Sequence, residues 1–278
     1  MVYRTVGQMI ELEAAMLLIP MLVALIYGEM NIVPAFLIPA VCAGVLGFIF
    51  AHTFPPRDRI LYARDGFMIV ALAWLVLSGI GALPFVISRE IPSYIDAFFE
   101  TASGFTTTGA TIIRDVEALS HGTLFWRSFT HWVGGMGVLV LVMAVLPTTA
   151  DRSIHIIRAE MPGPVVGKLV PRVRQTAKIL YLIYIGLTVA QIIFLCIGGM
   201  NLFESAVYTF GTAGTGGFGI KADSLGSYSP YIQWVVTIFL VLFAANFNIY
   251  FLMLMRKFKA VASSDEPVSY THLTLPTN

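Results

Sequence analysis

Long apolar runs alternate along the chain with short polar segments. Six of the runs are long enough to cross a bilayer as a helix, which takes about 20 residues. They cover residues 9–27, 32–51, 66–88, 124–146, 179–199 and 231–255. The composition agrees with this pattern, because 57% of the residues are hydrophobic, 12% are charged and the mean hydropathy is +0.81. The sequence therefore predicts an all-α membrane protein, and soluble classes, which carry about 25% charged residues, fit poorly.

Two polar stretches between these runs are copies of one another. The stretch that begins at Ser93 reads SYIDAFFETASGFTTTGAT, and the stretch that begins at Asn201 reads NLFESAVYTFGTAGTGGFG, 108 positions later without a gap. In both copies an acidic residue, Asp96 or Glu204, follows the first residue by three positions, which is typical of the capped start of a helix. Each copy predicts a short helix, over 94–104 in the first, followed by a Thr/Gly loop.

The repeat extends into the flanking apolar runs. Residues 66–88 correspond to 174–196 in the same register, and Trp126 corresponds to Trp234. Internal symmetry of this kind is typical of membrane transport proteins. The sequence predicts two N-terminal spans followed by two repeats of span, pore helix, filter loop and span. The expected divisions are an N-terminal helix pair over 1–58, pore repeats over 59–150 and 174–262, a cytoplasmic linker over 151–173 and a tail over 263–278.

Positive charge is concentrated on alternate flanks of the six runs. Thirteen of the 17 Lys and Arg residues lie on one set of flanks: Arg4, Arg57, Arg59, Arg64, Arg152, Arg158, Lys168, Arg172, Arg174, Lys178, Arg256, Lys257 and Lys259. The positive-inside rule places this set in the cytoplasm, together with both termini. Both Thr/Gly loops then fall on the outer side, where a short helix can enter the membrane without crossing it.

The two loops carry the chemistry that a dehydrated cation such as K⁺ requires. Backbone carbonyls replace the water shell of the ion, and glycine adopts the dihedral angles that point successive carbonyls inward. Thr hydroxyls add further oxygens. Either loop alone is equally typical of a flexible polar loop, and the duplication favours an ion pathway. The candidate residues are Thr106, Thr107, Thr108, Gly109 and Ala110 in the first loop and Thr215, Gly216, Gly217 and Phe218 in the second.

Several stretches resemble the Trk/Ktr/HKT superfamily of potassium transporters, and in particular the membrane subunit of bacterial Trk systems. They read FFETASGFTTTGAT, WRSFTHWVGGMGVLVLVMAVLP, EMPGPVVGKLVPRVRQTAKILYLIY and GTGGFG, and the resemblance covers about residues 6–266. It implies four repeats around a central K⁺ pathway, with filter glycines at Gly109 and Gly217. It also implies a homodimer, a cytoplasmic nucleotide-binding regulatory subunit, and a bacterial or archaeal plasma membrane.

The sequence departs from that family in two respects. It contains two repeats, and at the same period a third would open near residue 282. The segment PVSYTHLTLPTN, from residue 267, has no family counterpart and resembles translated sequencing-adapter read-through. We therefore expect a truncated fragment that does not conduct by itself.

Other polar residues in the apolar runs allow two interpretations each. Asn246 and Asn248 either line a cavity below the filter or form interhelical hydrogen bonds. Arg127 is expected to extend toward the outer surface. His131 is expected to be packed or hydrogen-bonded rather than to bind a ligand. No nucleophile–base pair, phosphate loop or metal cluster occurs in the sequence, so we do not expect an enzyme. No cofactor is expected, and the only expected bound species is the transported K⁺. Membrane lipid is an expected partner, and nucleic acid is not.

Three alternatives remain open. A two-repeat cation channel would be complete as a dimer of four loops. A secondary cation carrier would work by alternating access, although carriers usually contain broken helices and the polar breaks here fall between the spans. A non-conducting membrane scaffold would leave the duplicated loops unexplained.

Overall fold

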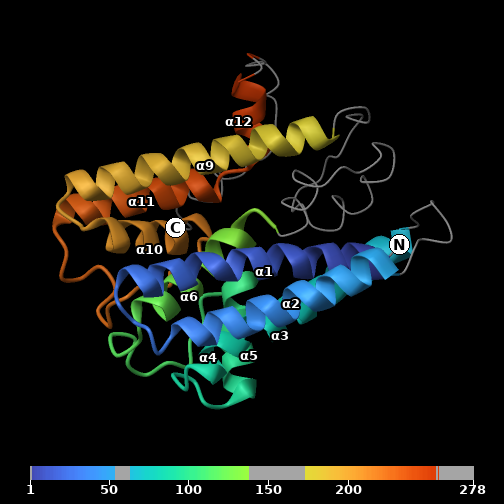
Figure 1. Cartoon of the computed structure of the whole chain (residues 1–278). Helices are drawn as coiled ribbons and strands as arrows, with labels where there is room; N and C mark the ends of the chain where they lie inside the picture. The colour runs from blue at the N-terminus through green and yellow to red at the C-terminus, as the bar shows by residue number, and fades with distance from the viewer. Residues whose placement is uncertain (1, 54–62, 138–172, 255, 257–278) are drawn as a thin grey trace, which may run out of the picture.

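A computed structural model describes residues 2–53, 63–137, 173–254 and 256, and all the regular structure in these ranges is helical (Figure 1). The prediction of an all-α protein is confirmed for this part of the chain. The helices are α1 (Val2–Ile26), α2 (Val33–Thr53), α3 (Ala63–Gly81), α4 (Leu83–Ile87), α5 (Tyr94–Phe105), α6 (His121–Gly135), α9 (Val173–Ile197), α10 (Leu202–Ala213), α11 (Pro230–Ala244) and α12 (Phe247–Leu254).

Helices α1 and α2 form a closely packed pair, as Figure 1 shows. Their backbones meet at glycines: a Cβ atom on Gly7 would lie 2.6 Å from the Ala51 nitrogen, and one on Gly47 would lie 2.7 Å from the Glu11 nitrogen. Any larger side chain at these two positions would force the helices apart. The pair packs through α1 onto α3 and α6.

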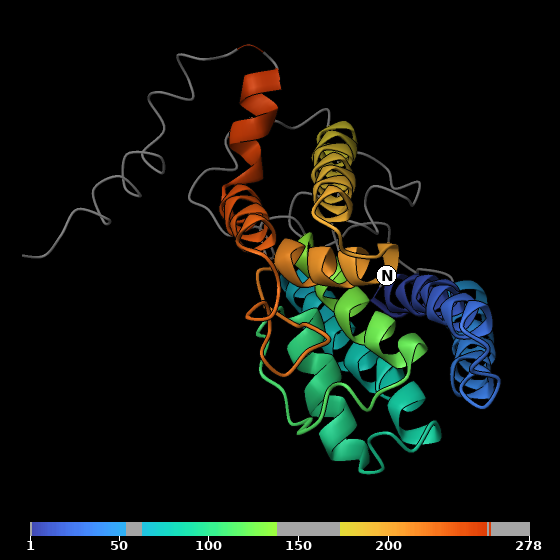
Figure 2. The same ribbon diagram turned by 90° about the vertical axis from the view of Figure 1, so that its left-hand side faces the viewer.

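The short helix α10 lies in the middle of the molecule. It contacts α6 on one side and α9 and α11 on the other, and Figure 2 shows it between these layers. The other short helix, α5, packs between α3 and α6. Each short helix thus packs on one or more longer helices, which positions the loop that follows it.

Four helical segments within the described ranges are long and apolar enough to cross a membrane: Val2–Ile26, Val33–Thr53, Asp65–Ile87 and Ala177–Ile197. They correspond to four of the six predicted spans. Residues 138–146 of the predicted span 124–146 lie outside the described residues, so the length of this span is not tested. The last predicted span contains the shorter apolar helix Pro230–Ala244.

The apolar run 231–255 does not form one continuous helix. Ala245 has a ψ angle of 144°, which ends α11, and α12 begins at Phe247. The Asn246 carbonyl accepts a hydrogen bond from the Ile249 nitrogen at 2.9 Å, which starts the new helix. Asn competes well for local backbone hydrogen bonds at helix ends, so a helix boundary is a common place for it.

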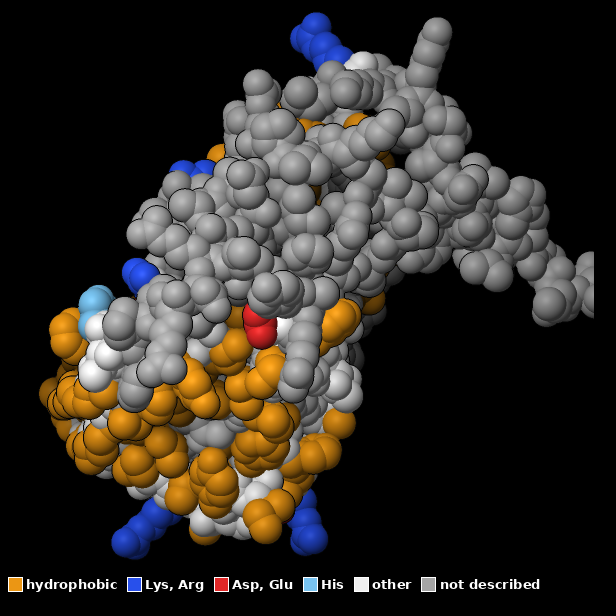
Figure 3. All heavy atoms as spheres, turned by 90° about the vertical axis from the view of Figure 1, so that its right-hand side faces the viewer, with side chains coloured by type: hydrophobic (Ala, Val, Ile, Leu, Met, Phe, Trp, Pro, Cys, Tyr) orange, Lys and Arg blue, Asp and Glu red, His pale blue; other side chains and the backbone are white. Residues whose placement is uncertain are grey.

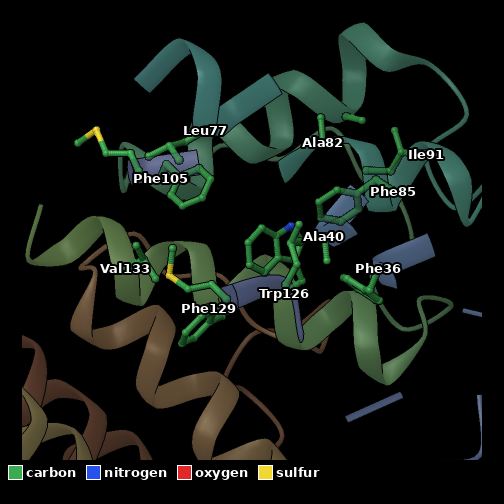
Figure 4. Close-up of a cluster of buried hydrophobic side chains, with 14 of the residues drawn as sticks. Phe36, Ala40, Leu77, Ala82, Phe85, Ile91, Phe105, Trp126, Phe129 and Val133 are labelled. Carbon is green, nitrogen blue, oxygen red and sulfur yellow. The ribbon is translucent and has the colours of Figure 1, made fainter. Parts of the chain in front are cut away.

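The core of the N-terminal half is built around Trp126 of α6 (Figure 4). Its indole is fully buried, its Nε1 donates a hydrogen bond to the Gly81 carbonyl at 2.8 Å, and the Phe105 ring meets it edge-on at 6.1 Å. Buried Trp usually pairs its N–H in this way. The contact fixes α6 against the break between α3 and α4.

The structure corrects the register in which the two repeats correspond after the loops. Ser120 caps α6 and Ser229 caps α11, so these helices start 109 residues apart rather than 108. Trp126 therefore corresponds to Val235, which is buried, whereas Trp234 is 67% exposed. A one-residue insertion between loop and helix is accommodated outside the helices, which the gapless alignment could not reveal.

Many large hydrophobic side chains are exposed on the outside of the bundle. Figure 3 shows a continuous apolar patch of this kind on one face. Those on α2 are Leu37, Ile38, Val41, Val45, Leu46, Phe48 and Ile49. Apolar patches of such extent mark membrane or protein contacts. A lipid environment satisfies them without further partners.

Candidate functional site

Both short helices begin as the sequence predicts. The Ser93 hydroxyl accepts a hydrogen bond from the Asp96 nitrogen at 3.4 Å, and the Asn201 side chain accepts one from the Glu204 nitrogen at 2.8 Å. Each helix is 12 residues long, and the second starts 108 residues after the first. The capped starts fix the direction of the helices, whose carbonyl ends then point into the Thr/Gly loops.

The two loops share an unusual backbone conformation. Thr107 and Thr215 both have φ of 55°, and Gly109 and Gly217 have φ of 76° and 85°. The left-handed region is ordinary for glycine and rare for a β-branched residue such as Thr. Backbone strain of this kind tends to be retained at functional sites. The same sequence of angles at a spacing of 108 residues shows that the loops are conformational copies.

Each loop folds back on the last turn of its own helix. In the first, the Thr108 nitrogen donates to the Ser103 carbonyl at 2.9 Å, and the Thr106 hydroxyl donates to the Ala102 carbonyl at 2.7 Å. In the second, the Gly217 nitrogen donates to the Gly211 carbonyl at 3.2 Å. These bonds hold the loops against the helices and satisfy part of the helix carbonyls.

The tertiary structure brings the two loops into contact. A Cβ atom on Gly109 would overlap the carbonyl of Gly216, so the backbones touch at this point. Five of the nine candidate residues are exposed and three are half-buried. The exposed ones are Thr106, Thr108, Ala110, Thr215 and Gly217, and the half-buried ones are Thr107, Gly109 and Gly216.

Phe218 is the ninth candidate, and its side chain is only 3% exposed. Its ring lies 3.9 Å from the His131 ring, centroid to centroid, and 3.6 Å from the guanidinium carbon of Arg127. The ring therefore does not line an open surface. Its role in this structure is to pack the second loop onto α6.

The prediction that Arg127 extends toward the surface is wrong. Its side chain is 3% exposed, and its Nε donates a hydrogen bond to Glu100 Oε1 at 2.6 Å. Glu100 lies on α5 and its side chain is fully buried. The sequence signal for a charge inside an apolar run was present, but its partner lies 27 positions away on another helix. Only the packing of α5 against α6 reveals the pair.

His131 packs against the second loop, as expected. It is fully buried, and a Cβ atom on Gly216 would overlap its ring. Neither ring nitrogen has a hydrogen-bond partner among the described residues. Its ring packs on the Phe218 ring, with 3.9 Å between the ring centroids. The described part of the chain contains no group of three or more His, Cys, Asp or Glu residues able to hold a metal ion.

The two asparagines lie where the apolar run 231–255 divides into two helices. Asn246 is half-buried and occupies the break between α11 and α12 rather than the interior of a continuous helix. The backbone of Asn248 belongs to α12, and its side chain lies outside the described residues. Whether either lines a cavity stays a prediction.

Together, the apolar helices and the short helices with strained loops define a multi-pass α-helical membrane protein. The chain belongs to the TrkH family of cation transport proteins, whose sequence model matches residues 28–270. The expected resemblance is thereby confirmed. The family consists of transporters.

Individual relatives agree with the family assignment. The Trk system potassium uptake protein TrkH of Escherichia coli is 40% identical over 254 residues, which are 90% of this chain and 52% of the relative. An uncharacterised cation transporter of Methanocaldococcus jannaschii is 32% identical over 253 residues, 91% of this chain and 52% of the relative. The crystal structure of the potassium transporter TrkH from Vibrio parahaemolyticus superposes with a TM-score of 0.76 at 36% identity, covering 90% of this chain and 50% of that one. The chain spans about half the length of these relatives.

Proposed function

We propose that this chain contributes to potassium uptake across a plasma membrane, and that the ion passes along the two Thr/Gly loops by channel-like permeation. The relatives from Escherichia coli and Vibrio parahaemolyticus are named as a potassium uptake protein and a potassium transporter. The observation that carries the proposal is the duplicated loop geometry, with left-handed Thr107 and Thr215 followed by left-handed Gly109 and Gly217.

The chemistry of the loops suits K⁺. Left-handed residues that alternate with ordinary ones turn successive carbonyls toward the same side, and carbonyl oxygens replace the hydration shell of the ion without a full charge in the membrane. The carbonyl ends of α5 and α10 add a partial negative charge at the same place. Together these groups favour a monovalent cation over an anion.

In this proposal the two repeats are pore repeats and supply half of a ring of four. The remaining loops belong to further repeats of the complete protein. Both termini face the cytoplasm, since most Lys and Arg residues lie on that side. A homodimer and a cytoplasmic nucleotide-binding regulatory subunit complete the assembly that the family resemblance implies.

A second candidate, a secondary carrier with alternating access, is favoured by one observation. The break at Ala245, between α11 and α12, is a discontinuity inside an apolar run, and carriers typically bind their substrates at such breaks. Uptake rates distinguish the two mechanisms. A carrier couples K⁺ entry to a second ion in a fixed ratio, whereas permeation follows the electrochemical gradient of K⁺ alone.

The Gly109→Ser variant tests the proposed pathway in the complete protein that carries this sequence, expressed in cells without their own K⁺ uptake. The backbone at position 109 has a φ of 76°, which is unfavourable for any residue with a side chain. A serine side chain there would also collide with the backbone of Gly216. We expect the preference for Rb⁺ over Na⁺ to fall by roughly tenfold or more, since a loop displacement that removes about 1.4 kcal/mol of differential binding has this effect. Radiotracer uptake of the two ions measures it.

The matched control is Gly28→Ser. Gly28 has nearly the same φ, 74°, but no described atom lies within 4 Å of its Cβ position and it is remote from the loops in sequence. This variant carries the same backbone strain and should retain wild-type selectivity. Unchanged ion selectivity in Gly109→Ser, with uptake intact, would sink the proposed pathway.

A further inference from the structure

A buried ion pair lies directly behind the two loops. Arg127 of α6 donates from Nε to Glu100 at 2.6 Å and from Nη1 to the Gly219 carbonyl at 3.1 Å, and its guanidinium lies 3.6 Å from the centre of the Phe218 ring. All three contacts are made by one planar group. Arg can bind in several fixed directions at once, which Lys cannot.

Glu100 makes the corresponding contacts with the first loop. Its carboxylate accepts hydrogen bonds from the Thr111 hydroxyl at 2.8 and 3.0 Å and from the Ile112 nitrogen at 3.0 Å. These two residues follow Ala110 directly. Glu100 therefore fixes the chain that leaves the first loop, while Arg127 fixes the chain that leaves the second.

The second repeat does not have a Glu at the position of Glu100. In the 108-residue register, Tyr208 occupies the position of Glu100. Its hydroxyl donates to the Ser224 carbonyl at 2.8 Å, and a Cβ atom on Gly219 would lie 3.0 Å from its ring. The second repeat thus supports its loop with a neutral side chain, and the charged pair is an added feature that connects the two repeats.

The pair is also neutral as a whole, and this matters beside a cation pathway. A buried guanidinium without its carboxylate would place an uncompensated positive charge in a medium of low polarity, where charges act over long distances. It would repel an entering K⁺. A carboxylate without its guanidinium would instead attract an entering K⁺.

We infer that Arg127 and Glu100 are positioning residues for ion selection: together they hold both loops in one arrangement, and each neutralises the charge of the other. The inference rests on the proposed function. The pair sets the spacing between the chain segments that leave the two loops. Helix packing alone does not fix this spacing at the level of individual carbonyls.

The test compares Glu100→Gln, Arg127→Met and the double variant in the complete transporter. For each, Rb⁺ uptake gives the half-saturating concentration and maximal rate, and competition with Na⁺ gives the selectivity. In Glu100→Gln we expect the half-saturating concentration to rise by roughly tenfold, as a nearby uncompensated charge predicts. In Arg127→Met we expect it not to rise, because the remaining carboxylate attracts cations, while selectivity falls by roughly tenfold.

The double variant separates charge from position. Removing both charges should return the half-saturating concentration to within about threefold of the wild-type value, because the local field is again neutral. Selectivity should stay low, because neither loop is held. Arg127→Lys retains the charge without the fork of donors, so it should keep the wild-type half-saturating concentration and lose part of the selectivity.

Arg114→Gln is the control, since Arg114 is an exposed cation in the segment between α5 and α6 and should affect neither quantity beyond about twofold. Variants that only lower the amount of protein in the membrane, with unchanged half-saturating concentration and selectivity, would overturn the inference. A double variant with wild-type selectivity would do the same.

If a single variant fails to accumulate, Arg127→Lys and the double variant carry the test. If the wild type transports no Rb⁺, the proposed function fails, and K⁺-dependent thermal stabilisation of the purified protein then tests the pair: equal stabilisation of wild type and Glu100→Gln would overturn it. If Gly109→Ser alters selectivity and the pair variants do not, only the present inference fails.

Discussion

At the scale of single residues, Gly109 and Gly217 occupy corresponding positions in the two loops but have different surroundings. Both have left-handed φ angles, which a side chain rarely adopts. Gly109 also touches the backbone of Gly216, whereas no described atom lies within 4 Å of the Cβ position of Gly217. A substitution at Gly217 is therefore opposed by the backbone conformation alone. A substitution at Gly109 is opposed by the backbone conformation and by the collision with Gly216.

We expect Gly217→Ala to destabilise the protein by about 1 kcal/mol, the cost of a left-handed alanine. Gly109→Ala should lose about 1–3 kcal/mol more, because the new methyl group collides with a backbone that cannot move freely. Thermal unfolding of the two purified variants measures the difference. Equal melting temperatures would mean that the loops do not touch as described.

At the scale of elements, α6 combines three functions on its different faces. Trp126 anchors it in the N-terminal core, Arg127 and His131 support the loops, and Gly134 and Gly135 admit close neighbours. Its N-terminus is held from outside as well. The Glu29 carboxylate accepts hydrogen bonds from the backbone nitrogens of His121 at 2.8 Å and Gly122 at 3.1 Å, which completes the helix cap.

Because of this cap, we expect the stability of the folded protein to fall at acidic pH. Burial raises the pKa of Glu29, but hydrogen bonds from the His121 and Gly122 nitrogens and from the His121 imidazole, with the charge of that ring, hold the pKa below its ordinary value of 4.5. A carboxyl with a lowered pKa in the folded state stabilises it above the unfolded pKa, and this contribution is lost as the pH falls through the folded value.

Glu29→Gln should therefore unfold at a lower temperature than the wild type at pH 7, and the gap should close as the pH falls below about 4.5. Melting curves of both proteins between pH 7 and pH 3 measure it. Asp96→Asn is the control, because Asp96 is an acidic residue in the first turn of α5, where the Ser93 hydroxyl forms the cap. A gap that is independent of pH would show that the cap does not depend on the charge.

At the scale of the molecule, the two repeats are joined by aromatic and glycine contacts. The Tyr184 hydroxyl of α9 donates to the Trp132 carbonyl of α6 at 2.8 Å, and the Trp132 indole donates to the Thr188 hydroxyl at 3.0 Å. Gly135 lies in the same seam: a Cβ atom there would meet the Tyr184 hydroxyl at 2.6 Å and the Ala213 carbonyl at 2.9 Å.

We expect Gly135→Val to separate the repeats and to destabilise the protein by about 1–3 kcal/mol, as overpacking does. Gly186→Val serves as the control, since Gly186 is helical and, apart from its chain neighbours and the backbone of its own helix, no described atom lies within 4 Å of its Cβ position. Thermal unfolding in detergent compares the two. A Gly135→Val variant as stable as Gly186→Val would contradict the packing of α6 against α9.

The sequence alone determined the helical class, four of the spans, the two capped short helices and the loops that follow them. These features depend on local patterns: apolar length, an N-cap with an acid three positions on, and glycine where the backbone turns left-handed. The duplication of the loops was legible for the same reason, because neighbouring residues specify each copy. The break at Asn246 was missed, since a single polar residue in an apolar run does not by itself end a helix.

Only the tertiary structure decided what connects these elements. It placed Gly109 against Gly216, paired Arg127 with Glu100, buried Phe218 and shifted the correspondence of Trp126 to Val235. Each of these depends on residues that are far apart along the chain and meet only when α5, α6 and α10 pack together. A charged residue inside an apolar run needs either a partner of opposite charge or contact with water. The packing of the helices determines which of the two it has.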